Sequence, residues 1–191
     1  EGIVEGETLE YEFFGSQIPF GSSQNTFVAR SGEGTDVDNY DITYVYGTLT
    51  VTPKGIAPEP GNGMTVGELA DVVYNGSEQA QKPTVKDGDT ELVEGVDYDL
   101  TYSEDLTNAG TVTVTVTGKG NFTGSREVSW YIAYKSIEDA TVNLDKQLTY
   151  NGQEQTQTID SVTVDDLTVT YDVTGNKGTD AGDYTLTITG T

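Results

Sequence analysis

The stretch "NAGTVTVTVTGKGNFTG", residues 108–124, alternates valine and threonine over seven positions before a glycine-rich turn. In a strand, alternate side chains point to opposite faces, so Val112, Val114 and Val116 share one face and the threonines the other. This pattern is typical of a strand with one buried and one solvated face. A second stretch, "DYTLTITG" at 183–190, repeats the alternation with Tyr184, Leu186 and Ile188. We therefore predict a β-strand at each place, and after the first one a glycine-flanked turn and the start of another strand.

The Gly118-Lys119-Gly120 sequence in that turn invites comparison with a phosphate-binding loop. Such a loop requires a glycine five residues before the Gly-Lys pair and a serine or threonine after it. Position 113 is threonine and position 120 is glycine, so neither requirement is met. We interpret the glycines as turn residues.

The composition limits the classes of function. The 191 residues include 32 acidic and 9 basic side chains, for a formal net charge of −23. An acidic surface repels phosphate backbones, which argues against a nucleic-acid partner. The charge is typical of a solvated surface, and the alternative is that clustered carboxylates bind calcium. No apolar run approaches the ~20 residues needed to cross a bilayer, so we expect no membrane insertion. There is no cysteine, which excludes disulfides and thiolate metal sites.

Internal repetition is the strongest signal along the chain. "MTVGELADVVYNGSEQAQ" from Met64 aligns without gaps to "ATVNLDKQLTYNGQEQTQ" from Ala140, at an offset of 76 positions. "TNAGTVTVTVTG" from Thr107 matches "TDAGDYTLTITG" from Thr179 at an offset of 72. A change of offset with conserved strands indicates duplicated units with loops of different length.

A weaker copy precedes these two. "NTFVARSGEGT" from Asn25 resembles "TVTVTVTGKGN", and Gly47 opens a later alternating strand that Pro53 closes. The pattern predicts a partial first repeat at 1–54, a Pro/Gly-rich linker and entry at 55–66, a complete middle repeat at 67–135, and a third repeat at 136–191 that stops before its last strand. We expect the chain to be part of a longer tandem array.

These strands and turns predict an all-β fold of tandem small β-sandwich modules of the immunoglobulin-like type. The sequence Asp180-x-Gly182-x-Tyr184 supports the sandwich, because it matches the tyrosine corner in which the hydroxyl bonds to backbone ahead of its strand. The middle copy has Val112 in place of the tyrosine. A β-grasp-like arrangement is the second choice.

The ordered motifs in "YNG…GVDYDLTYSEDLTNAGTVTVTVTGKGNFTG" resemble the tandem repeats of bacterial surface proteins known as MBG or YDG domains, and "GSSQNTF…DNYDITYVYGTLTVTP" resembles a variant of them. The resemblance covers nearly the whole chain. It implies immunoglobulin-like or related all-β modules in large extracellular, wall-attached or surface-attached proteins. It implies stalk and adhesive roles and no catalytic residues.

The sequence offers few candidates for chemistry. It has no histidine and no Gly-x-Ser-x-Gly, so we expect no enzyme activity. Two acidic clusters are candidates for calcium, "DVDN" and "DGD", and the second also reads as a hairpin turn. An intramolecular isopeptide bond would need a lysine, an asparagine and a nearby acid. The calcium candidates are Asp36, Asp38, Asp87 and Asp89, with Asn39 beside the first pair; the isopeptide candidates are Lys82, Lys86, Asn108 and Asn121.

Four of the tyrosines lie on expected strands, where they either form an aromatic surface for glycans or fill a thin core and its rim. They are Tyr44, Tyr46, Tyr131 and Tyr134. The expected function is a non-catalytic stalk or spacer that contributes to adhesion. The alternatives are a glycan- or mucin-binding module and an accessory domain of a secreted carbohydrate-active enzyme. Expected partners are host glycans or surface proteins and neighbouring repeats.

Overall fold

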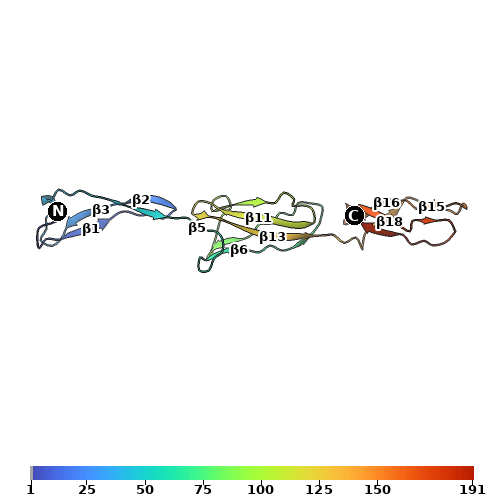
Figure 1. Cartoon of the computed structure of the whole chain (residues 1–191), viewed down its shortest axis with the longest axis horizontal. Helices are drawn as coiled ribbons and strands as arrows, with labels where there is room; N and C mark the ends of the chain where they lie inside the picture. The colour runs from blue at the N-terminus through green and yellow to red at the C-terminus, as the bar shows by residue number, and fades with distance from the viewer. Residues whose placement is uncertain (1) are drawn as a thin grey trace. The chain divides into compact units, whose positions relative to one another are not determined.

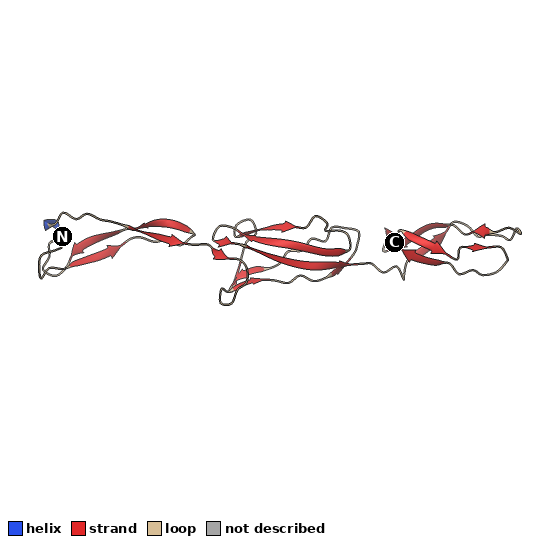
Figure 2. Ribbon diagram, viewed as in Figure 1, coloured by secondary structure: helices blue, strands red, loops and turns tan. Residues whose placement is uncertain are grey.

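The computed structural model describes residues 2–191, and almost all of its regular structure is β-strand (Figures 1 and 2). One short 3-10 helix, η1 (Val37–Asn39), is the exception. This confirms the all-β class. The strands are β1 (Leu9–Phe13), β2 (Gly21–Asn25), β3 (Phe27–Ser31), β4 (Gly47–Val51), β5 (Lys54–Gly55), β6 (Met64–Val66), β7 (Val72–Val73), β8 (Val85–Asp87), β9 (Thr90–Glu91), β10 (Tyr98–Tyr102), β11 (Gly110–Gly118), β12 (Phe122–Thr123), β13 (Ser125–Ala133), β14 (Thr141–Leu144), β15 (Gln155–Thr156), β16 (Ile159–Val164), β17 (Leu167–Thr168), β18 (Tyr171–Thr174), β19 (Lys177–Gly178) and β20 (Thr187–Gly190).

The chain divides into two compact units, and the division falls within β11 and β13. One unit holds the chain up to Leu69 together with Lys82–Tyr102 and Thr113–Ser129. The other holds Ala70–Gln81, Ser103–Val112 and Trp130–Thr191. The repeat boundaries expected from the sequence cut the chain elsewhere and stay a prediction. Within residues 2–191 there is no helix with the length and hydrophobicity needed to cross a membrane.

The N-terminal part of the first unit consists of two antiparallel strand pairs. β1 pairs with β3, with Tyr11 opposite Ala29, and β2 pairs with β4, with Ser23 opposite Leu49. β4 begins at Gly47 and ends just before Pro53, as the sequence predicts. Proline lacks the N–H that a ladder requires, which accounts for this end.

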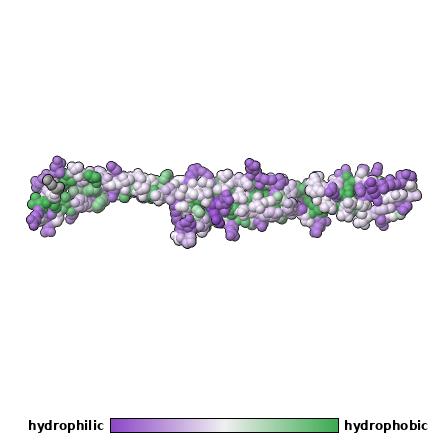
Figure 3. Space-filling model, viewed as in Figure 1, coloured by the Kyte–Doolittle hydropathy of each residue, from purple (hydrophilic) through white to green (hydrophobic). Residues whose placement is uncertain are grey.

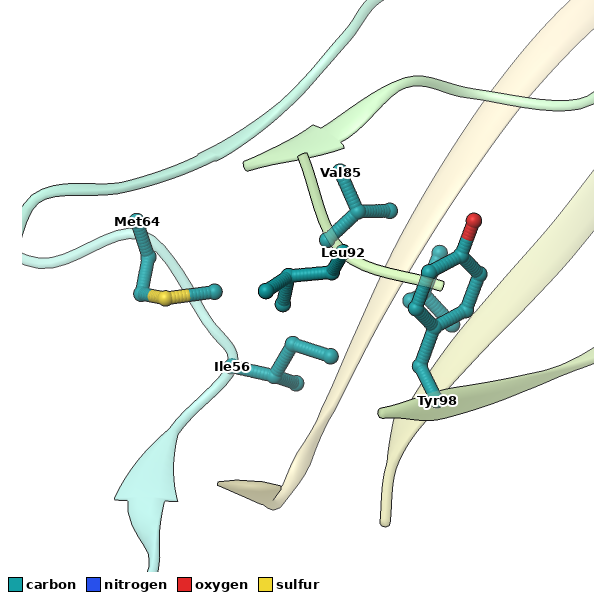
Figure 4. Packing of buried hydrophobic residues seen from close by; sticks show 6 residues of the cluster. Ile56, Met64, Val85, Leu92 and Tyr98 are labelled. Atoms are coloured by element: carbon teal, nitrogen blue, oxygen red, sulfur yellow. The ribbon is translucent and has the colours of Figure 1, made fainter. Parts of the chain in front are cut away.

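The main hydrophobic core of the first unit lies between two sheets, one of order β6-β8-β9 and the other including β10 and β11. Met64, Val85 and Leu92 come from the first sheet or its hairpin, and they meet Tyr98 and Val116 from the second (Figure 4). Val112, Val114 and Val116 are each at most 1% exposed, so the predicted core face of this strand is confirmed.

The Pro/Gly-rich segment expected as a linker also contributes to this core. Lys54 N donates to Asn121 O and Ile56 N to Thr123 O, each at 2.8 Å, as β5 pairs with β12 in parallel. Ile56 is fully buried and belongs to the same cluster. The segment therefore closes one end of the core rather than only connecting two repeats.

β13 is an interior strand of a four-stranded sheet of order β10-β11-β13-β7. Its pairing with β7 is parallel, with Ile132 opposite Val72. Trp130 and Ile132 are 2% and 0% exposed, whereas Tyr131 between them is 39% exposed. A strand with a neighbour on each side satisfies its backbone groups on both edges.

The two strongest sequence repeats fold with the same registers. Val66 lies opposite Val85 in the β6–β8 pair, and Val142 lies opposite Val162 in the β14–β16 pair. Val85 and Val162 are both 1% exposed. Each pair continues into a hairpin with a two-residue turn, β8–β9 and β16–β17.

A second antiparallel strand pair of each repeat agrees in the same way. Leu100 lies opposite Val116 in the β10–β11 pair, and Val173 lies opposite Ile188 in the β18–β20 pair. The sequences are Tyr-Asp-Leu-Thr in β10 and Tyr-Asp-Val-Thr in β18. Register is set by the hydrophobic face and by the turns, so equal registers require the same pattern in both copies.

The Tyr-Asn-Gly turns also share one local geometry. The Oδ1 of Asn75 accepts from Ser77 N, and the Oδ1 of Asn151 accepts from Gln153 N, both at 2.9 Å. The following glycines, Gly76 and Gly152, have φ of 76° and 75°. A side-chain oxygen that bonds two residues ahead, followed by a left-handed residue, accounts for Asn-Gly at these positions.

Candidate functional site

An aromatic cluster lies in the first 46 residues, where Figure 3 shows one of several patches of hydrophobic surface. Phe27 is its centre, with ring centroids 5.8 Å from Tyr11, 5.7 Å from Phe13, 5.8 Å from Tyr44 and 5.6 Å from Tyr46. Three of these four contacts are edge-to-face, the arrangement that the ring quadrupole favours.

Two of the sequence candidates, Tyr44 and Tyr46, are half-buried in this cluster. Their rings stack at 12° and 5.9 Å, and Ala29 N donates to the Tyr44 hydroxyl at 3.1 Å. Both rings pack against β3, as in the core interpretation. The expectation that Tyr44 and Tyr46 lie on a strand is wrong, because β4 begins only at Gly47. Tyr131 and Tyr134 belong to the other unit and are 39% and 79% exposed.

The exposed face of the same cluster was missed by sequence reasoning. Tyr11 and Phe13 alternate along β1 and are 56% and 65% exposed. Phe14 and Ile18 follow at 55% and 88%. Large exposed apolar side chains mark contact surfaces, so this face is the candidate binding surface of the N-terminal part. The alternation of apolar and charged residues in "LEYEF" (residues 9–13) was the sequence pattern that could have predicted this face.

Two of the calcium candidates, Asp36 and Asp87, use their carboxylates in contacts within the protein. Asp36 caps η1, and its Oδ1 accepts from Asp38 N at 3.2 Å. Asp87 accepts from Lys54 Nζ at 2.5 Å, and Asp89 lies in the two-residue turn after it, as the hairpin interpretation of "DGD" expects. Over residues 2–191 no three or more acidic, histidine or cysteine side chains are grouped so as to hold a metal. Calcium binding stays a prediction.

Three of the isopeptide candidates, Lys82, Asn108 and Asn121, form other side-chain hydrogen bonds. Lys82 Nζ donates to Glu94 Oε2 at 2.7 Å, and this bond raises the pKa of Lys82. A raised pKa keeps the amine protonated, which opposes attack on an amide. Lys86 lies opposite Glu91 in the β8–β9 pair, while the side chain of Asn121 accepts from Phe20 N at 2.8 Å. The bond itself stays a prediction.

Asp105 organises the turn that precedes β11. Its carboxylate accepts from the backbone N–H of Asn108 and of Thr107 at 2.9 Å, and from Asn108 Nδ2 at 2.8 Å. The hydrogen bonds from Asn108 and then Thr107 lower the pKa of Asp105 below its ordinary value. Donors aimed at a carboxylate favour its charged form.

Asp105→Ala is therefore expected to lower the melting temperature slightly at neutral pH and to have no effect in strong acid. A carboxyl whose pKa is depressed by folding stabilises the fold above its unfolded pKa, and the effect is lost as pH falls through the folded pKa. Thermal melts of both proteins across this range test it, with the exposed neighbour change Glu104→Ala as control. An equal difference at every pH would show that packing, not charge, is responsible.

The expected tyrosine corner is present. The Tyr184 hydroxyl donates to Asp180 O at 3.1 Å. The prediction that Tyr184 lies on a core strand is wrong, because β20 begins only at Thr187 and Tyr184 is 54% exposed. Its ring instead covers Gly178, where any Cβ would overlap the ring carbons.

Tyr184→Phe is expected to destabilise the second unit by about 0.5–1 kcal/mol, because it removes one hydrogen bond. Tyr150→Phe is the matched control, since Tyr150 is also a tyrosine of the second unit and is similarly exposed, at 61%. Urea unfolding of both variants measures the difference. Equal midpoints for the two variants would show that the Tyr184–Asp180 bond adds nothing.

Two cavities of about 360 and 350 Å³ lie in the second unit, and sequence reasoning gave no sign of them. Tyr150, Gln155, Asn176 and Tyr184 are among the residues lining the first. The second is mainly apolar, and Leu186 lines both. Both volumes are in the range of small-ligand sites.

Comparison with protein-family models, with curated proteins and with solved structures finds no match to this chain.

Proposed function

We propose that this chain is a non-catalytic repeat segment of an extracellular bacterial surface protein, where it serves as a stalk or spacer. The observation that carries the proposal is the equal registers of the two antiparallel strand pairs in each repeat. Duplicated units that keep their strand pairings while loops vary are the pattern of an array built for length rather than for one chemical site. The resemblance to MBG or YDG repeats points the same way.

We also propose that each repeat is an immunoglobulin-like sandwich. The Tyr184–Asp180 hydrogen bond and the packing of sheet β6-β8-β9 against β10 and β11 support it. A β-grasp-like unit is the alternative. An experimental structure of a single repeat decides between the two by its strand connections.

Mechanical unfolding tests the stalk role. With the chain pulled from its two ends, residues 64–133 are expected to unfold as one event that lengthens it by on the order of 200 Å, given about 3.4 Å per extended residue. Gradual extension at low force without a distinct event would contradict the role. Release of sugars or peptides from bacterial or host glycoproteins by the purified chain would contradict its non-catalytic character.

A second role, adhesion to glycans, is favoured by the exposed rings of Tyr11 and Phe13. Aromatic faces provide large apolar contact area at little cost in conformational entropy. Glycan-array binding that is lost in Tyr11→Ala and retained in Tyr134→Ala supports this role. Tyr134 is the control because it is also exposed but lies outside the aromatic cluster.

A further inference from the structure

One edge of β20 has no neighbouring strand among residues 2–191. Within the described residues β20 pairs with β18 alone, whereas its counterpart β11 lies between β10 and β13. The β18–β20 and β10–β11 pairs have the same register, since Thr174 opposite Thr187 corresponds to Thr101 opposite Thr115. The position that β13 fills beside β11 is thus open beside β20.

The backbone groups that face this open edge can be identified. Thr191 N donates to Thr170 O at 3.1 Å, which places the odd-numbered residues of this stretch toward β18. Alternate residues of a strand bond to opposite sides, so Ile188 and Gly190 face the open edge. The backbone N–H of Gly118, the counterpart of Gly190, points to the equivalent edge of β11 and donates to Gly124 O at 2.9 Å.

The core beside this edge is incompletely filled, and apolar side chains border the unfilled space. Val114 and Val116 are fully buried in the middle repeat, but their counterparts Leu186 and Ile188 are only half-buried. Leu186 and Ile188 border the cavity of about 350 Å³, together with Val142 and Val162. An incomplete core of this kind loses the contact area that a further strand supplies.

We propose that the β20 edge and its cavity form an acceptor site for one more β-strand, with bulky apolar residues at alternate positions in the pattern of β13. A strand with that pattern bonds its backbone to Ile188 and Gly190 and places two large side chains in the apolar space. β13 does both in the middle repeat, where Trp130 and Ile132 are 2% and 0% exposed. Addition of a strand to an exposed edge is an established form of peptide recognition.

The first test extends the chain itself. Thr191 corresponds to Lys119, so a copy of residues 120–134 is added directly after Thr191. The amide hydrogens of Ile188 and Gly190 are expected to exchange about a hundred-fold more slowly in the extended protein. Val116 and Gly118, already beside β13, are the internal reference and should not change. Unchanged exchange at Ile188 and Gly190 overturns the proposal.

The matched control is the same extension with threonine at the copies of Trp130 and Ile132. It keeps strand propensity but removes the apolar side chains, so the slowing at Ile188 and Gly190 is expected to fall at least about ten-fold. Equal protection by both extensions overturns the side-chain part of the proposal.

A separate peptide with the sequence of residues 124–134 tests recognition without covalent attachment. In β13, Tyr131 N donates to Asp71 Oδ1 and Ala133 O accepts from Tyr74 N, so odd positions bond toward β7. Even positions bond toward β11. N-methylation at the Trp130 position should abolish binding to the chain in calorimetry, and N-methylation at the Tyr131 position should weaken it less.

Occupation of the site by a second copy of the chain or by a saccharide would give different results in these experiments. Association of the chain with itself that protects Ile188 and Gly190, seen in sedimentation, would overturn the choice of a β13-like strand as the occupant. Saccharide binding that perturbs Leu186 while the peptide fails to bind would also overturn it.

Discussion

Replacing Val116 with lysine is expected to unfold the sheet pair around the main core. Val116 is fully buried among Ile56, Met64 and Tyr98, with no acidic partner in that cluster. An unpaired charge in such a place costs roughly 4 kcal/mol or more, which matches the whole stability of a domain of ~70 residues. Circular dichroism and urea unfolding should show loss of the cooperative transition.

Thr117→Lys is the control, because it adds the same charge one position along the same strand. Thr117 is exposed and lies opposite Asp99, so a lysine there gains a cross-strand partner. Its unfolding midpoint should stay at or slightly above that of the unaltered chain. Similar midpoints for the two variants would mean that the alternation of this strand does not decide the fold.

Phe27→Ala is expected to disorder the N-terminal strand pairs. The ring of Phe27 contacts four others, so its removal takes away every pairwise aromatic contact except the Tyr44–Tyr46 stack. Because Phe27 is only half-buried, we expect a loss of about 2–3 kcal/mol, below the usual range for a buried phenylalanine.

Hydrogen exchange at the β1 and β3 amides measures this loss, with Phe14→Ala as the control. Phe14 is 55% exposed and lies outside the cluster, so its removal should change exchange little. Faster exchange in both variants to the same extent would show that general hydrophobicity, rather than the Phe27 contacts, holds these strands.

Alternation alone was sufficient to predict where β11 and β4 lie and which face of β11 is buried, and it located only the second half of the stretch 183–190 as the strand β20. It was not sufficient for the pairing of β7 with β13, because a strand of two residues, Val72–Val73, carries no periodic signal. It also failed at Tyr184. Residues 183–186 alternate as well as 187–190 do, but an extended segment forms a strand only where a neighbour bonds its backbone.

The candidate surfaces were less predictable than the strands. The tyrosine corner was predicted from five residues, because its hydrogen bond is local and its glycine spacing is specific. The Phe27 cluster joins β1, β3 and a segment near residue 45, and such contacts depend on register between distant strands. The cavities beside Leu186 depend on which neighbour a strand has, which composition does not encode.

The ion pairs of this chain determine how copies of it behave in concentrated solution. Six cationic side chains, Arg30, Lys54, Lys82, Lys119, Lys135 and Lys177, are each paired with a carboxylate of the same chain. Few positive groups are left to attract another copy, and the net charge of −23 makes copies repel one another. That repulsion keeps exposed strand edges apart at neutral pH and vanishes near the isoelectric point of about 4.1. Acidification thus removes the colloidal barrier that separates one chain from the next.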